Sequence, residues 1–205
     1  MTTEIYQDRN ARRELWFDDI LQSRADRIDA AFNAAGACCP KSQWTPRIDE
    51  AQTPPIRHLI RYFEEKSLGT ESVQAAALDP ADLRPALGYV NLLEPVDDGC
   101  DFRFRIFGTF VAAVTGQDLT GKCLSEMPAS DYVVDHAIAT YRASYARRLP
   151  LLSSRIPLGA ATTSRWERLV LPFTGAGNNV VRLLVGAVPI GLAGIPMRPN
   201  LMSGV

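Results

Sequence analysis

Two histidines, His58 and His136, are the side chains of this chain best suited to proton transfer or metal binding. Any serine–histidine–aspartate arrangement would have to use one of them, and the spacing of the neighbouring residues selects neither. The chain also lacks the G-x-S-x-G and H-E-x-x-H patterns of a nucleophile elbow and a zinc-binding helix. His58 lies between Ile56 and Leu59 of an amphipathic helix, and we predict that it faces solvent. We therefore expect no catalytic residues.

Four cysteines could bind a metal or form disulfides, and their spacing argues against both. Cys38 and Cys39 are adjacent, which is poor geometry for a disulfide and a poor zinc pattern. Cys100 and Cys123 stand apart from them and from each other. We predict reduced thiols, no metal site and a cytoplasmic protein.

Arginines on the expected strands are further charged groups that could act in binding. One interpretation is that they form cross-strand ion pairs with Glu94 and Glu167, each worth about 0.2–1 kcal/mol, on a solvated sheet face. The alternative is an anionic ligand or partner that docks on the sheet. The arginines concerned are Arg103, Arg105, Arg165 and Arg168.

Length and composition limit the classes of protein that this chain can belong to. Of its 205 residues, 46% are hydrophobic and 22% are charged, which indicates an ordered globular chain. The formal net charge is −1, so a nucleic-acid or anionic-membrane surface is not expected. No apolar run approaches the roughly 18–20 residues that span a bilayer, and residues 1–10 lack the features of a signal peptide. We expect neither nucleic acid nor membrane as a partner.

The first third of the chain has helical periodicity. Apolar residues at near-heptad spacing predict one amphipathic helix over residues 9–35, interrupted in its stripe at Arg24. Residues 38–55 read as a connector. A second helix is predicted from Thr53 to about Gly69, and a third, short helix begins at Asp79-Pro80, since proline fits the first helical turn.

From Gly88 onward the apolar period changes from 3.6 residues to two, which is typical of strands. A long helix over residues 130–148 interrupts this pattern. Phe102, Phe104 and Ile106 are expected on the same, buried side of one strand. The order of elements predicts an α+β domain with an antiparallel sheet and helices packed on one face. The expected strands cover residues 89–94, 102–107, 151–158, 165–173 and 180–188.

Four segments resemble a PAS domain, in particular a subfamily of small, nearly stand-alone bacterial PAS proteins. They are DPADLRPALG at residues 79–88, DFRFRIFGT at 101–109, TGQDLTG at 115–121 and WERLVLP at 166–172. The resemblance implies a five-stranded antiparallel sheet with helices on one face, preceded by N-terminal helices. The implied division of the chain is an N-terminal helical arm and connector, a PAS-like domain and a C-terminal tail, at residues 1–52, 53–190 and 191–205.

The resemblance also implies a ligand pocket between the long helix and the inner face of the sheet. Aromatic and polar side chains there suit a small ligand, because ligand pockets are mostly apolar with a few polar groups. Either of two nearly opposite helix faces could point inward, one with Tyr132 and His136 and the other with Tyr141. The candidate ligand-binding residues are Phe104, Ile106, Tyr132, His136, Tyr141 and Trp166.

The cofactor, if any, is left unknown by the sequence. Haem-binding PAS sensors take a haem ligand from a histidine near the place of His136, but their other motifs are missing here. A surface or hydrogen-bonded histidine is the alternative. Cys100 and Cys123 lack the Asn-Cys-Arg-type setting of flavin photosensors.

An unpartnered apolar stripe on the N-terminal helix favours a homodimer. PAS domains commonly pair through a helix placed just before the core, and a stripe without a partner must bury itself somewhere. The alternative is that this helix folds back on its own domain in a monomer. The candidate dimer-interface residues are Phe17, Leu21, Ile28 and Phe32.

These observations favour a PAS-type sensory, ligand-binding or protein-interaction module without catalytic activity. Nothing outside the PAS-like part is long enough to be an effector domain, so its signal would pass to a partner protein in trans. Two alternatives remain open: a small enzyme that uses the same pocket, and a structural adaptor without a ligand.

Overall fold

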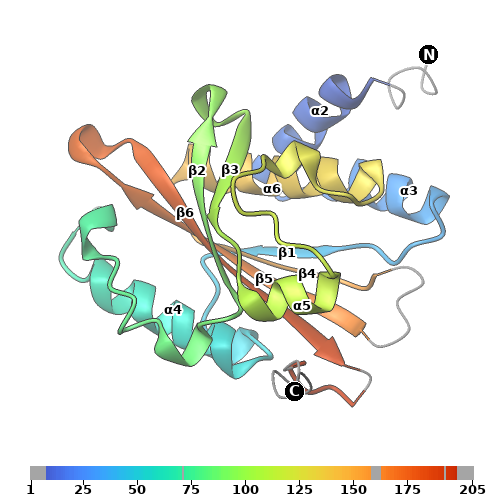
Figure 1. Ribbon diagram of the computed structural model, residues 1–205. Coiled ribbons are helices and arrows are strands. Elements are labelled where there is room, and N and C mark those ends of the chain that lie inside the picture. Colours follow the sequence, from blue (N-terminus) through green and yellow to red (C-terminus); the bar gives the residue numbers. More distant parts are fainter. Residues whose placement is uncertain (1–7, 71, 158–162, 192, 198–205) are drawn as a thin grey trace.

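A six-stranded antiparallel sheet forms the centre of the computed structural model, which describes residues 8–70, 72–157, 163–191 and 193–197 (Figure 1). The strand order across the sheet is β1-β4-β5-β6-β2-β3. The strands are β1 (Lys41–Trp44), β2 (Val90–Val96), β3 (Asp101–Ile106), β4 (Leu151–Arg155), β5 (Thr163–Thr174) and β6 (Val180–Gly191). The expected α+β class is confirmed. The expected C-terminal tail falls partly on residues 198–205, outside the described residues.

Five α-helices accompany the sheet in the described part of the chain. They are α2 (Arg9–Leu21), α3 (Asp26–Ala34), α4 (Pro54–Ser67), α5 (Thr109–Thr115) and α6 (Asp131–Arg147). The short helix expected at Asp79-Pro80 is replaced by turns and a 3₁₀ helix over Arg84–Ala86. There the Asp79 carboxylate accepts a hydrogen bond from the backbone N–H of Ala81, 2.8 Å away, and closes a turn.

The sheet has one strand more than the five expected, because part of the connector pairs with it. Lys41 lies opposite Ser154 and Trp44 opposite Leu151, so β1 extends the sheet beyond β4. The side chains of β1 are mostly exposed and show no apolar alternation. Backbone hydrogen bonds to an existing edge form this strand, and such pairing leaves no trace in the apolar pattern.

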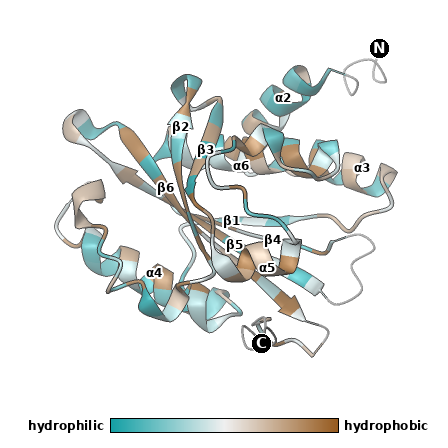
Figure 2. Cartoon of the chain, in the orientation of Figure 1, coloured by the Kyte–Doolittle hydropathy of each residue, from teal (hydrophilic) through white to brown (hydrophobic). Residues whose placement is uncertain are grey.

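Helices cover both faces of the sheet rather than one. In Figure 1, α4 lies on one side of the sheet, and α6 with α2 and α3 lies on the other. Both faces need a cover because β5 and β6 are apolar on both sides: Leu169 belongs to the core under α4, whereas Val170 belongs to the core under α6. Hydrophobic residues recur along β6 in Figure 2. Helix α4 approaches very closely at Gly186, where a Cβ atom would lie 2.5 Å from Cδ1 of Leu59.

The N-terminal region forms two helices instead of the single one expected over residues 9–35. Ser23 has a φ of 55°, and this left-handed residue turns the chain between α2 and α3. Both helices pack against α6 (Figure 1), and their cluster also includes Trp44 of β1 and Leu151 of β4 at the edge of the sheet. Their buried side chains share a cluster with Ala139, Ala143 and Leu151, and these side chains are Trp16, Ile20, Ile28 and Phe32.

A buried carboxylate on α6 also attaches α2. The Asp135 side chain has 0% exposure and accepts hydrogen bonds from Arg9, Arg12 and Arg13 of α2. Its Oδ1 lies 2.6 Å from Nε of Arg13, and its Oδ2 lies 2.9 Å from Nε of Arg12. A buried charge with this many charged donors is well compensated, so it holds α2 in one register on α6.

Candidate functional site

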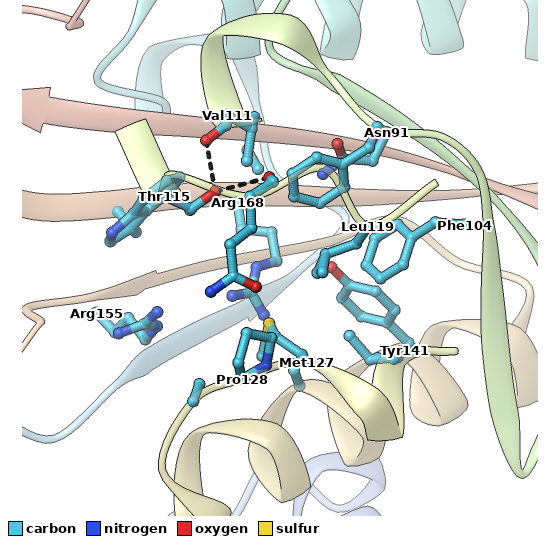
Figure 3. A pocket seen from close by; sticks show the side chains of 17 residues that line it. Asn91, Phe104, Val111, Thr115, Leu119, Met127, Pro128, Tyr141, Arg155 and Arg168 are labelled. Atoms are coloured by element: carbon cyan, nitrogen blue, oxygen red, sulfur yellow. Dashed lines mark hydrogen bonds between the residues drawn. The ribbon is translucent and has the colours of Figure 1, made fainter. Parts of the chain in front are cut away.

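A cavity lies between α6 and the inner face of the sheet and is called the α6 cavity below (Figure 3). Its volume is about 150 Å³. All of β2–β6 contribute to it, together with α5, α6 and the loops that flank α5. A cavity of roughly this volume is known to hold one benzene molecule, so the α6 cavity suits a small ligand.

The hollow arises from small residues at facing positions. Ala137 on α6 and Ala187 on β6 both line the cavity, and Ala187 lies directly opposite Arg168 of β5 in the sheet. Larger side chains at these two places would fill the space between helix and sheet. Leu119 and Leu124 of the connecting loops close another side and are buried. The walls of the cavity are therefore mainly apolar.

Two arginines and a tyrosine supply the main polar groups of the α6 cavity. The guanidinium carbon of Arg168 lies 5.6 Å from the ring centre of Tyr141, which is a cation–π distance. Burial raises the pKa of the Tyr141 hydroxyl, so this group stays a neutral hydrogen-bond donor. Burial, followed by the positive charge of Arg168, lowers the pKa of Arg155 to about 10. Both arginines are therefore charged near neutral pH.

Three of the six candidate ligand-binding residues line the cavity: Phe104, Tyr141 and Trp166. Ile106 does not, because its side chain is 54% exposed. The strands β2 and β3 shift register there: Leu93 pairs with Phe104 and Leu92 with Ile106, so Arg105 is an extra residue. Such a bulge reverses the alternation of side chains and turns Ile106 outward.

Tyr132 and His136 do not line the α6 cavity and contact the N-terminal helices instead. His136 also borders a small gap lined by Arg155 and Arg168 of the sheet. The ring of Phe32 is 4.9 Å from that of Tyr132 and 5.4 Å from that of His136, measured between ring centres. The face of α6 that carries Ala137 and Tyr141 is therefore the one that lines the cavity. This answers the question that the helical spacing left open.

The imidazole of His136 is enclosed and uncharged. Burial lowers its pKa to about 3, and the charges of Arg168 and Arg155 act in the same direction. Its Nε2 atom is buried without a hydrogen-bond partner. The gaps beside this ring have volumes of about 10 and 80 Å³, far below the roughly 300–1,000 Å³ of cofactor-sized pockets. The surroundings of His136 therefore do not fit haem.

The other sequence candidates have separate places in the fold. His58 bonds the backbone carbonyl of Asp82, with 2.7 Å between Nε2 and the oxygen, and is not part of the cavity. Ile28 and Phe32 are buried within this chain, with 3% and 1% exposure, so neither is available to a second copy. Phe17 and Leu21 stay partly exposed at the edge of that cluster.

The arginines of the cavity were only partly visible in the sequence. The sequence indicates that Arg168 is a strand residue that could meet an anion, and it gives Arg155 no such role. A usable signal exists, because Trp166 and Arg168 are two residues apart on one strand and must share a face. Loop residues such as Leu119 and Met127 follow no period, and no sequence signal could have placed them in the cavity.

Within the described residues, no group of three or more histidine, cysteine, aspartate or glutamate side chains could hold a metal ion. All four cysteines are free thiols. None of the helices in the described ranges is long and apolar enough to cross a membrane.

A sheet covered on both sides, with a small cavity under its long helix, defines the chain as an α+β domain. The PAS domain family matches residues 51–188, which is more than half of the 205 residues, and the chain belongs to this family. PAS domains are in general sensory and signalling modules. No curated protein and no solved structure is similar enough to this chain to count as a match.

Proposed function

We propose that this chain is a PAS-type sensory module that binds a small molecule in the α6 cavity. It has no catalytic activity of its own and passes its signal to a partner protein in trans. The observation that carries the proposal is the cavity itself, which lies between α6 and the sheet and has mainly apolar walls with a few polar side chains. These polar residues are Asn91, Thr115, Gln117, Tyr141, Arg155 and Arg168. Pockets of this make-up bind small molecules.

The position of α6 supports a route by which an occupied cavity could be sensed. Ala137 and Tyr141 face the cavity, while Tyr132, His136 and Ala139 of the same helix pack on α2 and α3. A ligand that moves α6 would therefore change the packing of both N-terminal helices. Hydrogen exchange of the α2 amides with and without ligand measures this coupling, and identical exchange in both states would argue against this route.

Native mass spectrometry of the purified full chain, with its absorption spectrum, tests ligand binding. We expect a small co-purifying mass, or binding from a metabolite library, without a haem or flavin spectrum. The variant Ala187→Leu should abolish binding because it fills the cavity, whereas Ala176→Leu, in an exposed turn, should not affect it. Binding that survives Ala187→Leu would contradict the proposed site.

An enzyme in the same cavity is the main competing hypothesis. Ser153 and Ser154 border the gap beside His136, but a histidine with a pKa of about 3 is a weak general base near neutral pH. We expect no turnover of generic esterase, thioesterase or phosphatase substrates. Turnover that Tyr141→Phe abolishes would replace the sensory proposal, and a protein that binds nothing would favour a structural adaptor.

A homodimer stays part of the proposal, with an interface formed by fewer of the stripe residues than the sequence indicated. Phe17 and Leu21 are the two stripe residues that remain partly exposed. Light scattering of the full chain and of Leu21→Glu tests this contact. We expect a dimer that weakens in the variant; a full chain that is monomeric at micromolar concentration would end the dimer hypothesis.

A further inference from the structure

The charged side chains that line the α6 cavity are all positive. Arg155 on β4 and Arg168 on β5 both line it, and the sheet register places them on the same face. Arg155 pairs with Trp166 and Arg168 with Ser153, so the two arginines stand diagonally across neighbouring strands. Long side chains at such diagonal positions are within reach of each other. No aspartate or glutamate is among the residues that line the cavity.

The two guanidinium groups have no anionic partner in the described part of the chain. Neither takes part in an ion pair or hydrogen bond there, and the buried Nε of Arg155 has no acceptor. The arginines that bind Asp135, by contrast, have 12–36% exposed side chains and still use a carboxylate. Placing two cations together in a partly buried site costs free energy unless an anion joins them.

The acids nearest in sequence cannot neutralise this pair. Glu167 lies between Trp166 and Arg168, but the alternation of β5 sends its side chain to the other face of the sheet. There it accepts hydrogen bonds from the backbone N–H groups of Gln52 and Thr53, 2.6 and 2.9 Å away. His136, near both arginines, is uncharged and adds no positive charge.

The other residues that line the cavity indicate the chemistry of the uncharged part of the ligand. Figure 3 shows Arg155 on the side of the cavity away from Phe104, Leu119 and Tyr141. An acidic group at the arginines would thus leave an apolar body facing aromatic and aliphatic side chains. No hydrogen bond joins the Tyr141 hydroxyl to another described residue, so it is free to donate to such a group. The volume of about 150 Å³ limits the body to a few carbon atoms or a single ring.

We propose that the ligand of the α6 cavity is a small carboxylate with a compact apolar body, whose charged group is bound by Arg155 and Arg168. This inference rests on the proposed function, that the cavity binds a small molecule. Guanidinium groups bind carboxylates through charge-assisted, often paired hydrogen bonds, and they also bind phosphate. The apolar walls favour the organic carboxylate over inorganic phosphate.

Calorimetry with the full chain near neutral pH tests the ligand class. The probes are acetate, isobutyrate, pivalate and benzoate, each paired with its neutral amide, and inorganic phosphate. We expect at least one carboxylate to bind about tenfold or more tighter than its amide, which corresponds to about 1.4 kcal/mol. Inorganic phosphate should bind more weakly than that carboxylate.

Variants identify the groups that bind the charge. Arg155→Met and Arg168→Met should each weaken the carboxylate about tenfold or more and leave the amide unchanged. Arg165→Met is the matched control, because Arg165 lies on the same strand but does not line the cavity. Melting curves establish that each variant is folded. If a methionine variant does not fold, Arg168→Lys is measured instead. The carboxylate–amide comparison in the unaltered protein still tests whether the cavity binds a negatively charged group.

The outcomes separate this inference from the proposed function. If amides bind as tightly as carboxylates, or the arginine variants bind carboxylates normally, the charge assignment is overturned and the cavity remains a ligand site. If phosphate alone binds, the organic ligand is overturned. If none of the probes and no metabolite binds, the proposed function fails as well.

Discussion

Glu167 and Arg168 are neighbours in the chain, and their side chains lie on opposite faces of the sheet. The Glu167 carboxylate accepts hydrogen bonds from Gln52 and Thr53 at the start of α4, whereas Arg168 lines the α6 cavity. Glu167 thus anchors α4 on one face of the sheet, and Arg168 places a positive charge in the α6 cavity on the other face. Because the strand separates them, Arg168 keeps a positive charge that this acid does not neutralise.

The anchor of α4 can be tested through Glu167. The Thr53 side chain makes no capping hydrogen bond, so the carboxylate of Glu167 is the acceptor for this turn of backbone. Glu167→Ala should lower the free energy of unfolding by about 2–3 kcal/mol, because buried N–H groups lose a charged acceptor. Urea denaturation measures the change. Glu94→Ala, which removes partly exposed ion pairs with Arg105 and Arg182, should cost less than about 1 kcal/mol. Equal effects would contradict the special role of Glu167.

The attachment of α2 depends on Asp135. Asp135→Asn leaves the guanidinium groups of Arg9, Arg12 and Arg13 without their shared carboxylate. We expect a loss of about 2–4 kcal/mol, towards the lower part of the range for buried pairs because the arginines reach water. Hydrogen exchange should show faster exchange along α2 while the strands stay protected.

Asp131 provides the matched control for Asp135. It pairs with Arg9 at 2.8 Å but has a 63% exposed side chain. Asp131→Asn should therefore change stability by less than about 1 kcal/mol. If α2 exchanges at the wild-type rate in Asp135→Asn, the carboxylate is not what holds this helix on α6.

The buried His136 makes stability depend on pH. Its pKa is about 3 in the folded chain, against 6.5 for an exposed histidine, so the unfolded chain binds the proton more tightly. The neutral imidazole therefore contributes stability that is present above about pH 6.5 and is lost as the pH falls towards 3. Between pH 7 and pH 5 this loss is about 2 kcal/mol.

Urea denaturation of the wild type and His136→Leu at both pH values measures this contribution. Between pH 7 and pH 5, the free energy of unfolding of the variant should fall by about 2 kcal/mol less than that of the wild type. This is expected because Arg155 and Arg168, the groups that face His136, keep their charge in that interval. His58→Gln retains His136 and should retain the wild-type pH dependence. An unchanged pH dependence in His136→Leu would show that the imidazole is not buried in its neutral form.

The bulge in β3 predicts different effects for two residues of one apparent stripe. Phe104 is buried at 2% exposure and Ile106 is 54% exposed. Phe104→Ala should cost about 3–5 kcal/mol, whereas Ile106→Ala should stay within about 0.5 kcal/mol of the wild type. Thermal denaturation of both variants measures the difference. A large loss in Ile106→Ala would mean that the strand keeps its regular alternation.

The amino-acid sequence by itself determined the class of the fold and most of its elements. Period-two runs located the strands from β2 to β6, and helical spacing located α4 and α6, because side-chain periodicity follows from the local backbone. The segments that resemble a PAS domain led to the family that the match confirms. Phe104, Tyr141 and Trp166 could be placed in a cavity because their elements had to face each other.

Only the tertiary structure decided what each face of an element covers. The periodicity of α6 is the same whether Tyr141 or His136 lines the cavity. The contacts of Phe32 of α3 with Tyr132 and His136 leave Tyr141 to line it. The strand β1, the bulge at Arg105 and the second cover of the sheet also arise from long-range pairing. A local pattern specifies which side chains share a face, but burial is a free energy of contact between distant segments, and only the folded chain brings those segments together.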